Sequence, residues 1–387
     1  MPPNSPPGPP PDSGLLKLIR DEVEAAGPIS FARFMDLALY HPAHGYYASG
    51  TGRIGPAGDF FTASDVGDAF GRCVARQIID IDRRIGPVDP FHVVEVGAGR
   101  GLLARDILDA LDELRPDLSR RLRYVMVDRS ESMRECAARQ VPEARVLGPE
   151  ELGDGYQGCL LAVELFDALP VHRVRRRGAS LFEVLVDVDE SGSLVEREAP
   201  APAELLAEAR RYGAAPDDEM EAEIALGAAP ELERLVGAFE RGVMIVVDYG
   251  MPAQALYDRE RRRGTLLAYH GHSTNEDYLS RVGQQDLTAH VNFTALEDHA
   301  RRCGLDVLGL TTQDRFLVAN GVLEEFEQPD LQTARDPRRV KRRLQAMQLI
   351  HPEGMGRTFR VLMLSKGCDG LGGLSGLVDP FSRDQRS

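Results

Sequence analysis

The sequence contains few basic residues, no closely spaced cysteines and no long apolar run. Its 387 residues include 46 lysines and arginines against 61 aspartates and glutamates, so the formal net charge is −15. Proteins that bind nucleic acids through the phosphates need a basic surface, and this charge balance argues against that class. No segment approaches the ~18 consecutive apolar residues of a membrane-spanning helix. We therefore expect neither a nucleic acid nor a membrane among the partners.

The five cysteines are scattered, and no two of them have the C-x-x-C spacing of a zinc or redox motif. This pattern is typical of reduced thiols in the cytosol. No cysteine or paired acid completes a four-ligand set with the histidines, so we expect no metal site. The first fourteen residues contain no basic residue and no apolar run, which argues against a secretory leader. Together these features predict a cytoplasmic location.

Short apolar runs alternate with segments that have helical spacing. Because the runs are rich in valine, leucine and isoleucine without polar alternation, they are typical of parallel strands buried on both faces. A helical pattern of leucines and isoleucines follows the first run directly, which gives the strand–helix–strand order of an open, doubly wound α/β fold. The predicted strands are Phe91–Val96, Leu122–Val127, Cys159–Val163 and Val243–Val247.

Two regions interrupt this alternation and suggest additions to the sheet. Residues 15–85 precede the first strand and are predicted to form an N-terminal helical cap. Residues 171–242 form a stretch far longer than a normal crossover, and we interpret them as an acidic insertion or substrate lobe. The sheet then comprises residues 86–170 and 243–367. Both ends of the chain, 1–14 and 368–387, are rich in proline or glycine and are predicted to be disordered.

A glycine-rich loop follows the first predicted strand. The segment Glu95-Val-Gly97-Ala-Gly99-Arg-Gly101 lets the backbone approach a ligand closely, and the next helix offers free N–H groups to an anion. The G-x-G-x-x-G dinucleotide fingerprint would place its last glycine at Leu102. Glu95, inside the strand end, favours an ammonium group as its partner.

The second predicted strand ends at Asp128, whose carboxylate can accept both hydroxyls of a ribose. These features together favour S-adenosylmethionine as the ligand. Glu95 can bind its ammonium group, the start of the helix after the glycine loop can bind its carboxylate, and Asp128 can bind its ribose. The alternative is a tight turn whose glycines serve only packing.

Ten collinear segments match the pattern of one known family: Phe34-Met35, Leu39–Tyr47, Gly58–Thr62, Phe70-Gly71, Glu95–Gly101, Glu164–Val171, Asp248–Gly250, Gly264–Leu266, Asp286–Phe293 and Gly354–Gly356. In this order, between about residues 29 and 365, they resemble the MidA-like class I methyltransferases, which include the mitochondrial complex I assembly-factor protein arginine methyltransferases. The sequence departs from the family pattern at Val163, where the family usually has asparagine, at Asn292, usually aspartate, and at Ser64-Asp65-Val66, usually Pro-Glu-Ile.

The resemblance implies a Rossmann-like, mainly parallel sheet of seven strands, S-adenosylmethionine as cofactor and methyl donor, and a protein arginine as the acceptor. By analogy with the family, that protein is a subunit of respiratory complex I. The resemblance also suggests that the segment with Gly58, Asp59 and Thr62 closes over the cofactor, with Asp59 at its amino-acid part. The alternative for this segment is a tight turn followed by a helix.

Two acids after the third predicted strand are the candidate catalytic residues. Methyl transfer from a sulfonium is an in-line displacement that needs no metal, so positioning is the main catalytic contribution. An arginine guanidinium must be oriented by carboxylates and must lose a proton. Glu164 and Asp167 are the best candidates for this clamp. Alternatively, Asp167 caps a helix and Glu164 binds backbone amides.

Four further residues and the charge of one segment each have two possible interpretations. Asp248 either faces the same cleft or belongs to a turn before Gly250, and Tyr46, Tyr47 and Tyr249 line an acceptor pocket or belong to the core. Residues 183–240 hold sixteen acids and four arginines. This net charge of −12 either attracts a basic protein substrate or is a solvated surface.

The predicted function is therefore an S-adenosylmethionine-dependent methyltransferase that acts on a protein side chain, with arginine as the leading candidate. A rival interpretation, motivated by Val163, is a cofactor-binding scaffold or assembly factor with impaired catalysis. A second rival, a nicotinamide-dependent oxidoreductase, is disfavoured by Leu102 and Glu95.

Overall fold

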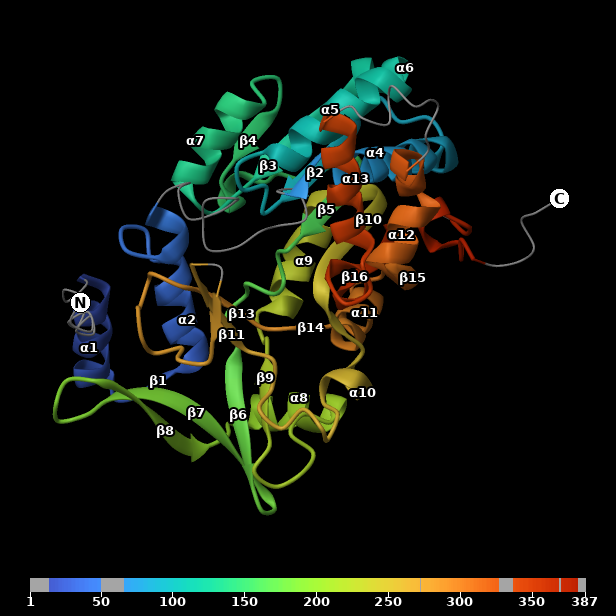
Figure 1. Ribbon diagram of the computed structural model, residues 1–387. Helices are drawn as coiled ribbons and strands as arrows, with labels where there is room; N and C mark the ends of the chain where they lie inside the picture. Colours follow the sequence, from blue (N-terminus) through green and yellow to red (C-terminus); the bar gives the residue numbers. More distant parts are fainter. Residues whose placement is uncertain (1–13, 50–65, 272, 327–336, 369, 382–387) are drawn as a thin grey trace.

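The computed structural model describes residues 14–49, 66–271, 273–326, 337–368 and 370–381. Within these residues a mixed α/β sheet carries helices on both faces, and a second lobe lies beside it (Figure 1). No helix of the described part of the chain is long and apolar enough to cross a membrane.

The central sheet has eight strands within the described residues. Their order is β15 (Asp306–Thr312), β16 (Phe359–Lys366), β10 (Phe239–Met251), β5 (Tyr156–Val163), β2 (Phe91–Val96), β3 (Leu122–Val127) and β4 (Arg145–Leu147), and β14 (Val291–Asn292) pairs with β10. Strand β16 runs antiparallel to both of its neighbours, whereas β10, β5, β2, β3 and β4 pair in parallel. The count differs from the expected seven by the two-residue strand β14.

The predicted strands agree with the observed ones because the local apolar pattern is strong. The predicted bounds of 91–96 and 122–127 are those of β2 and β3, and the other two predicted strands lie within the longer β5 and β10. Consecutive side chains such as Val93 and Val94 are both fully buried and belong to different hydrophobic clusters, one on each face of the sheet. The absence of polar alternation is thereby explained.

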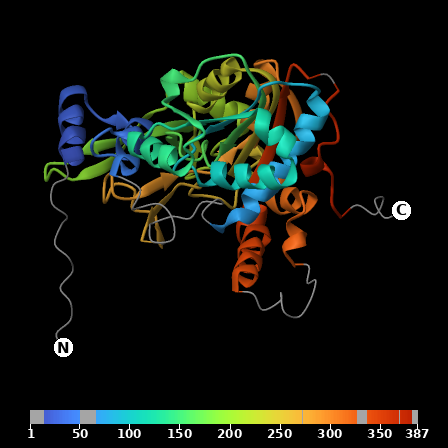
Figure 2. The same cartoon turned by 90° about the horizontal axis from the view of Figure 1, so that it is seen from above.

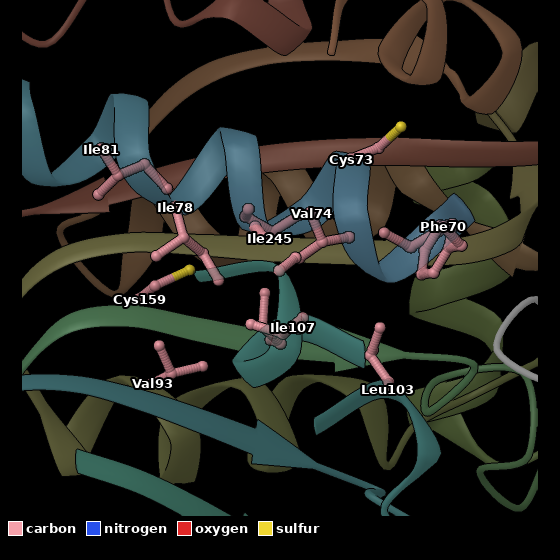
Figure 3. Packing of buried hydrophobic residues seen from close by; sticks show 14 of the residues in the cluster. Phe70, Cys73, Val74, Ile78, Ile81, Val93, Leu103, Ile107, Cys159 and Ile245 are labelled. Atoms are coloured by element: carbon pink, nitrogen blue, oxygen red, sulfur yellow. The ribbon is translucent and has the colours of Figure 1, made fainter. Parts of the chain in front are cut away.

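One face of the sheet is covered by six helices of the described chain. Figure 3 shows Val74 and Ile78 of α4 packed over Cys159 of β5 and Ile245 of β10, within one buried cluster. The six helices are α4 (Asp68–Ile85), α5 (Leu102–Leu114), α6 (Pro116–Arg121), α7 (Glu131–Gln140), α12 (Gln313–Ala319) and α13 (Pro337–Ile350). The other face carries α9 (Ala228–Ala238) and α11 (Phe293–Arg302).

The second lobe is assembled from three separate parts of the sequence. Its larger sheet has the order β1 (Ile29–Ser30), β7 (Ser180–Val188), β6 (His172–Arg177) and β9 (Glu221–Ile224), with β8 (Leu194–Pro200) beside β7. A smaller sheet has the order β12 (Ser273–Asn275), β11 (Leu267–His270) and β13 (Asp286–Thr288). The lobe also contains α1 (Gly14–Ala26), α2 (Phe31–Tyr40), η1 (Tyr46–Ser49) and α8 (Ala203–Tyr212), whereas α10 (Ala253–Leu256) contacts β10 of the central sheet and α11.

A shared core holds these parts together. Phe31 and Phe34 of α2 pack in one buried cluster with Val186 of β7 and Leu287 of β13. The N-terminal cap and the insertion are therefore one lobe, joined by the antiparallel pair β1–β7. The sequence did not indicate this association, because the pairing partners lie more than 150 residues apart.

The predicted boundaries of the cap and the insertion need correction. Helix α4 was assigned to the cap, but it packs on the central sheet, and in Figure 2 it lies far from α1. Helix α9 was assigned to the insertion, but Leu232 and Leu235 are buried against the other face of the sheet. Both helices are amphipathic, and each buries its apolar side on the sheet.

The predicted disorder of residues 368–387 does not hold for the described residues up to Phe381. Leu371 and Leu374 are buried in the core beside Cys368, and the Ser375 N–H donates to Asp80 at 2.8 Å. The few apolar side chains among the glycines hold this segment against the sheet helices. The predicted N-terminal tail, 1–14, lies outside the described residues apart from Gly14. The remaining short helices are η3 (Pro149–Glu151), η4 (Val322–Phe326), α14 (Met355–Thr358) and η6 (Ser375–Leu377).

Candidate active site

A cavity of about 1120 Å³ lies at the carboxyl ends of β2, β3 and β5, where α2 and η1 of the second lobe form the opposite wall. Strand β2 sits between β3 and β5, so the chain leaves β2 in one direction and returns on its other side. This reversal of strand order is where open α/β sheets bind ligands. Gly101 and Tyr249, two of the candidates predicted from sequence, do not line this cavity. The candidates that do line it are Tyr46, Tyr47, Glu95, Gly97, Gly99, Asp128, Glu164 and Asp167.

The glycine loop joins β2 to α5 with three residues in the left-handed region. The φ angles of Gly97, Gly99 and Gly101 are 76°, 53° and 77°. A Cβ on Gly99 would meet no atom within 4 Å, whereas one on Gly101 would lie 3.2 Å from the Cα of Ala137. Gly99 therefore keeps open the approach to the cavity, and Gly101 allows α5 to pack against α7.

Glu95 is buried at the end of β2, with its side chain at the floor of the cavity. Its Oε2 accepts a hydrogen bond of 2.7 Å from the hydroxyl of Tyr124 on β3. Burial raises the pKa of Glu95 to about 8, and the Tyr124 hydroxyl only partly offsets this. A nearby ammonium favours the ionised form of a carboxyl group and lowers its pKa. A buried carboxyl group such as Glu95 is therefore stabilised as a carboxylate when a cation binds beside it.

Asp128 follows β3 and turns back toward the glycine loop. Its Oδ2 accepts from the Gly99 N–H at 2.9 Å and its Oδ1 from the Ser130 N–H at 2.8 Å. Burial raises the pKa of Asp128, and these two N–H groups oppose the rise. Each oxygen keeps a second lone pair for a hydroxyl donor, so the carboxylate suits a ribose diol.

Glu164 and Asp167 follow β5 and both reach the cavity. Glu164 has a φ of 52°, unusual for a residue with a side chain, and its N–H donates to Val247 at 2.8 Å. Val163, just before it, also lines the cavity and places an apolar side chain there. Asp167 is only 3% exposed, and its buried Oδ1 forms no hydrogen bond with the described residues. Burial raises the pKa of Asp167 to about 6.

Asp248 does not line the cavity but holds the turn that carries the two acids. Its Oδ2 accepts from the N–H groups of Phe166 and Asp167 at 2.9 and 3.3 Å, and its Oδ1 accepts from the Tyr249 N–H at 2.9 Å. The side chain is fully buried, and burial together with Asp167 and Glu164 raises the pKa of Asp248. Neither interpretation from the sequence is correct, because Asp248 lies inside β10, not in a turn before Gly250, and its side chain does not line the cavity but anchors the turn after β5.

The wall from the second lobe contains Tyr46 and Tyr47, which the sequence analysis assigned either to an acceptor pocket or to the core, and also Tyr40 and Asp286, for which it gave no role. The Tyr47 hydroxyl donates to Asp286 Oδ1 at 3.0 Å, and the Tyr40 hydroxyl donates to the Ala168 carbonyl at 2.8 Å. The Tyr40 and Tyr47 rings lie 5.4 Å apart. Asp286 begins β13 and is the first residue of one of the segments that match the family pattern, which is the one signal that marked it. Tyr249 packs in the core against Phe359.

Arg129 places a cationic side chain against this wall. Its guanidinium lies 4.3 Å from the centre of the Tyr40 ring and donates to Asp36 at 3.1 Å. The aromatic face of Tyr40 thus already accommodates a planar cation.

Three predicted cofactor residues, Gly58, Asp59 and Thr62, lie outside the described residues. Within the described chain, no group of three or more His, Cys, Asp or Glu side chains is arranged to hold a metal ion.

The acidic insertion is partly neutralised by its own neighbours. Arg175 of β6 donates to Glu198 at 2.6 Å and to Glu221 at 2.7 Å, and Arg177 donates to Glu198 at 2.6 Å. The stretch of net charge −12 therefore meets a row of arginines that precedes it in the sequence, which weakens the interpretation that it attracts a basic substrate.

The structure combines a mixed α/β sheet with a glycine loop and with acids at the ends of three neighbouring strands, β5, β2 and β3. This combination is typical of enzymes that bind a nucleoside cofactor with a cationic part. The chain belongs to the family described as "Putative S-adenosyl-L-methionine-dependent methyltransferase", whose model matches residues 73–311. It is thus an S-adenosylmethionine-dependent methyltransferase, and S-adenosylmethionine is its cofactor. Membership of this family decides against a nicotinamide-dependent oxidoreductase.

Curated relatives and solved structures agree with this assignment. The chain is 28% identical to a mitochondrial protein arginine methyltransferase NDUFAF7 homolog of Drosophila melanogaster, over 91% of this chain and 85% of the relative. It is also 28% identical to the human protein of that name, over 92% and 84%. A crystal structure from Burkholderia thailandensis with bound S-adenosyl-homocysteine is 31% identical, covers 98% of both chains and superposes with a TM-score of 0.85.

The names of the curated relatives contradict the predicted cytoplasmic location. The relatives from fly, fish, mouse and human are all named mitochondrial. Scattered cysteines and the composition of the first residues were therefore a poor guide to location, because reduced thiols are compatible with more than one compartment.

Proposed function

We propose that this methyltransferase transfers its methyl group to an arginine side chain of a protein, and that Glu164 and Asp167 hold the guanidinium. The observation that carries the proposal is the buried Oδ1 of Asp167, which borders the cavity and forms no hydrogen bond with the described residues. A buried oxygen in this state costs stability unless a donor reaches it. A guanidinium supplies donors in a planar fork that matches carboxylates.

The second lobe supports a flat cationic acceptor. Tyr40 and Tyr47 present aromatic rings to the cavity, and Asp286 adds a carboxylate to that wall. The stacking of Arg129 on Tyr40 is an internal example of the contact that we propose for the substrate. The names of the curated relatives, which are protein arginine methyltransferases, favour the same acceptor.

The cofactor site follows from the same residues. When bound, S-adenosylmethionine supplies a methyl group on a positively charged sulfur. We propose that Glu95 pairs with the ammonium of the cofactor, that Asp128 accepts from the ribose hydroxyls, and that Gly97 and Gly99 let the loop approach, whereas Gly101, predicted as a third cofactor residue, serves the packing of α5 on α7. The contacts of Gly58, Asp59 and Thr62 with the cofactor stay predictions. The assignment of the fold to the Rossmann-like class I methyltransferases with a seven-stranded sheet and an N-terminal helical cap also stays a prediction.

Within this arrangement the chain's own acids do two tasks. Glu164 and Asp167 orient the guanidinium so that one nitrogen faces the methyl group, and Asp167 accepts the proton that this nitrogen loses. The raised pKa of Asp167, about 6, makes it a better proton acceptor than an exposed aspartate. Orientation of this kind supplies several kcal/mol of a displacement barrier, up to ~7–11 kcal/mol in well-oriented systems.

The test uses tritiated S-adenosylmethionine and a desalted protein lysate as the acceptor mixture. Asp167→Asn keeps the size of the side chain and should retain S-adenosylhomocysteine binding while label transfer falls by about 100-fold. Asp277→Asn, a change of the same kind at an exposed acid of the second lobe, should behave as the wild type. Acid hydrolysis of the labelled protein should release methylarginines.

Other outcomes select other functions. Tight binding of S-adenosylhomocysteine without label transfer by the wild type would favour the scaffold interpretation that Val163 raised. Label on a residue other than arginine would contradict the proposed acceptor. Enrichment of the label in a respiratory complex I subunit would support the partner that the family resemblance implies.

A further inference from the structure

Buried polar atoms without a hydrogen-bond partner are few in the described chain, and three of them lie on neighbouring side chains behind the cavity. They are Oδ1 of Asp167, the hydroxyl of Tyr249 and Nδ1 of His290. Such atoms are costly in a folded protein and commonly mark bound water or a functional role. Their occurrence in one place calls for a common explanation.

The side chain of Tyr249 lies between those of Asp167 and His290, and the three form a row. Its hydroxyl lies beside the Asp167 carboxyl, whose pKa it lowers, and beside Thr288, without reaching ordinary hydrogen-bond geometry. The rings of Tyr249 and His290 meet edge to face with their centres 5.6 Å apart. The Ala289 N–H, next to His290, donates to the Asp167 carbonyl at 3.1 Å, so the two ends of the row are tied through the backbone.

The row connects two cavities on opposite sides of one turn. Asp167 lines the large cavity, whereas Phe166, the preceding residue, and His290 line a second cavity of about 50 Å³. This volume holds more than one water molecule, since about 10–15 Å³ suffices for one. Glu208 and His299 also line it and are partly exposed, so the second cavity reaches the surface between α8 and α11.

We infer that Asp167, Tyr249 and His290 carry the proton of the methyl acceptor from the active site to this second cavity. The inference rests on the proposed function, in which Asp167 receives that proton. The bond between sulfur and methyl breaks with its electron pair on sulfur, and a nitrogen lone pair of the acceptor forms the new bond to carbon. The proton lost by that nitrogen passes to Asp167, through the Tyr249 hydroxyl and the His290 imidazole, and leaves to water.

A route for the proton behind Asp167 would let this buried carboxylate lose its proton while the cavity is occupied. Asp167 is only 3% exposed, and in the proposed function the cofactor and the acceptor both bind in the cavity in front of it. A proton retained on Asp167 would leave the site unable to accept the next one until both products had left. Tyr249 and His290 are therefore positioning residues that act through Asp167 and do not touch the substrate.

The state of His290 suits a relay. Burial, with Arg261 and Arg360 nearby, lowers the pKa of His290 to about 4. The ring is therefore neutral at pH 7, with one nitrogen that donates and one that accepts. A neutral ring can accept a proton on one side and release one on the other, so it carries no lasting charge in the protein interior.

The experiment compares Tyr249→Phe with Tyr278→Phe. Both changes remove one hydroxyl, but Tyr278 lies outside both cavities and its hydroxyl donates to the Leu266 carbonyl at 3.2 Å. The rate is the transfer of tritiated methyl to a fixed amount of desalted lysate protein, measured over a range of S-adenosylmethionine concentrations in H₂O and in D₂O. Thermal unfolding and S-adenosylhomocysteine binding are measured in parallel.

For Tyr249→Phe we expect kcat to fall about 10- to 100-fold with an unchanged KM for S-adenosylmethionine, a larger solvent isotope effect and an undiminished unfolding temperature. Tyr278→Phe should unfold at a lower temperature and keep the kcat of the wild type. An unchanged kcat in Tyr249→Phe would overturn the relay. A fall in kcat together with losses of stability and cofactor binding would also overturn it, since a structural role would then explain the result.

The nature of the labelled product separates the two proposals. If the label is on lysine or serine instead of arginine, the proposed acceptor is wrong, but the relay is still tested, because these acceptors also lose a proton. If the label is on arginine and Tyr249→Phe is as fast as the wild type, the proposed function stands and the relay fails.

Discussion

The hydroxyl of Tyr124 donates a hydrogen bond of 2.7 Å to Oε2 of Glu95, and both side chains are buried below the glycine loop. With a pKa of about 8, Glu95 is mostly protonated at pH 7 in the free protein. A bound ammonium reverses this preference. On the proposed assignment of Glu95 to the ammonium of the cofactor, binding of the cofactor is therefore linked to the release of a proton.

We predict that S-adenosylhomocysteine releases up to about one proton per site when it binds at pH 7. Calorimetry in two buffers of different ionisation enthalpy measures this number. The affinity should rise as the pH increases from 6 to 8, and Glu95→Gln should abolish the release and weaken binding. Heats that do not depend on the buffer would contradict the assignment of Glu95 to the ammonium.

The same raised pKa affects the free protein. Because the folded pKa of about 8 lies above the ordinary value of 4.5, the folded state holds this proton more tightly than the unfolded state. The stability that Glu95 contributes is fully present below pH 4.5 and is lost as the pH rises through 8. Comparison with Glu95→Gln isolates this contribution in urea unfolding at several pH values.

Two glycines of the loop should separate folding from binding. Gly101→Ala places a Cβ 3.2 Å from the Ala137 Cα at a φ of 77°, so we expect a loss of about 2 kcal/mol in the free energy of unfolding. Gly99→Ala meets no neighbour and should cost only about 1 kcal/mol, but its methyl group enters the approach to the cavity and should weaken S-adenosylhomocysteine binding.

Urea unfolding and calorimetry measure both quantities for both variants. Gly97→Val serves as a positive control, because its larger side chain is expected to abolish cofactor binding. Equal effects of Gly99→Ala and Gly101→Ala on both measurements would show that the loop does not divide these tasks as proposed.

Asp248 should be essential for the turn that carries Glu164 and Asp167. Asp248→Ala leaves the N–H groups of Phe166, Asp167 and Tyr249 without their acceptor, and we expect a loss of about 3 kcal/mol or more. Asp248→Asn keeps one acceptor oxygen and removes a charge that burial disfavours, so its loss should be smaller. Denaturant midpoints rank the two variants, and the reverse order would argue against the anchoring role.

Tyr47 and Asp286 should affect the acceptor and not the cofactor. Tyr47→Phe removes the 3.0 Å hydrogen bond to Asp286 and should raise the KM for the acceptor protein by about fivefold, the effect of about 1 kcal/mol. The Kd for S-adenosylhomocysteine should stay the same, which is the internal control. A weaker Kd with an unchanged KM would assign this wall to the cofactor.

The sequence predicted the features that depend on local pattern. Strands β2 and β3 have the bounds that their apolar runs predicted, and Glu164 and Asp167 reach the cavity because they follow a buried strand. Asn292, a departure from the family pattern, accepts from the Ala295 N–H at 3.1 Å as the cap of α11. An aspartate would do the same, so this departure preserves the helix start.

The features that the sequence did not reveal depend on contacts between distant segments. Asp286 joins the site only because β13 packs against α2, and β1 pairs with β7 across more than 150 residues. Glu164 adopts a left-handed conformation that no local preference of glutamate predicts. Leu374 is buried by a contact with the sheet helices that a glycine-rich segment does not suggest.

The central claim, that this cavity delivers a methyl group to a guanidinium held by Asp167, is tested most directly by mass spectrometry. Lysate proteins are incubated with the enzyme and S-adenosylmethionine that carries a deuterated methyl group, and their peptides are sequenced. We predict the heavy methyl on arginine side chains with the wild type and its loss with Asp167→Asn. Heavy methyl on another residue type, or arginine labelling that survives in Asp167→Asn, would contradict the account.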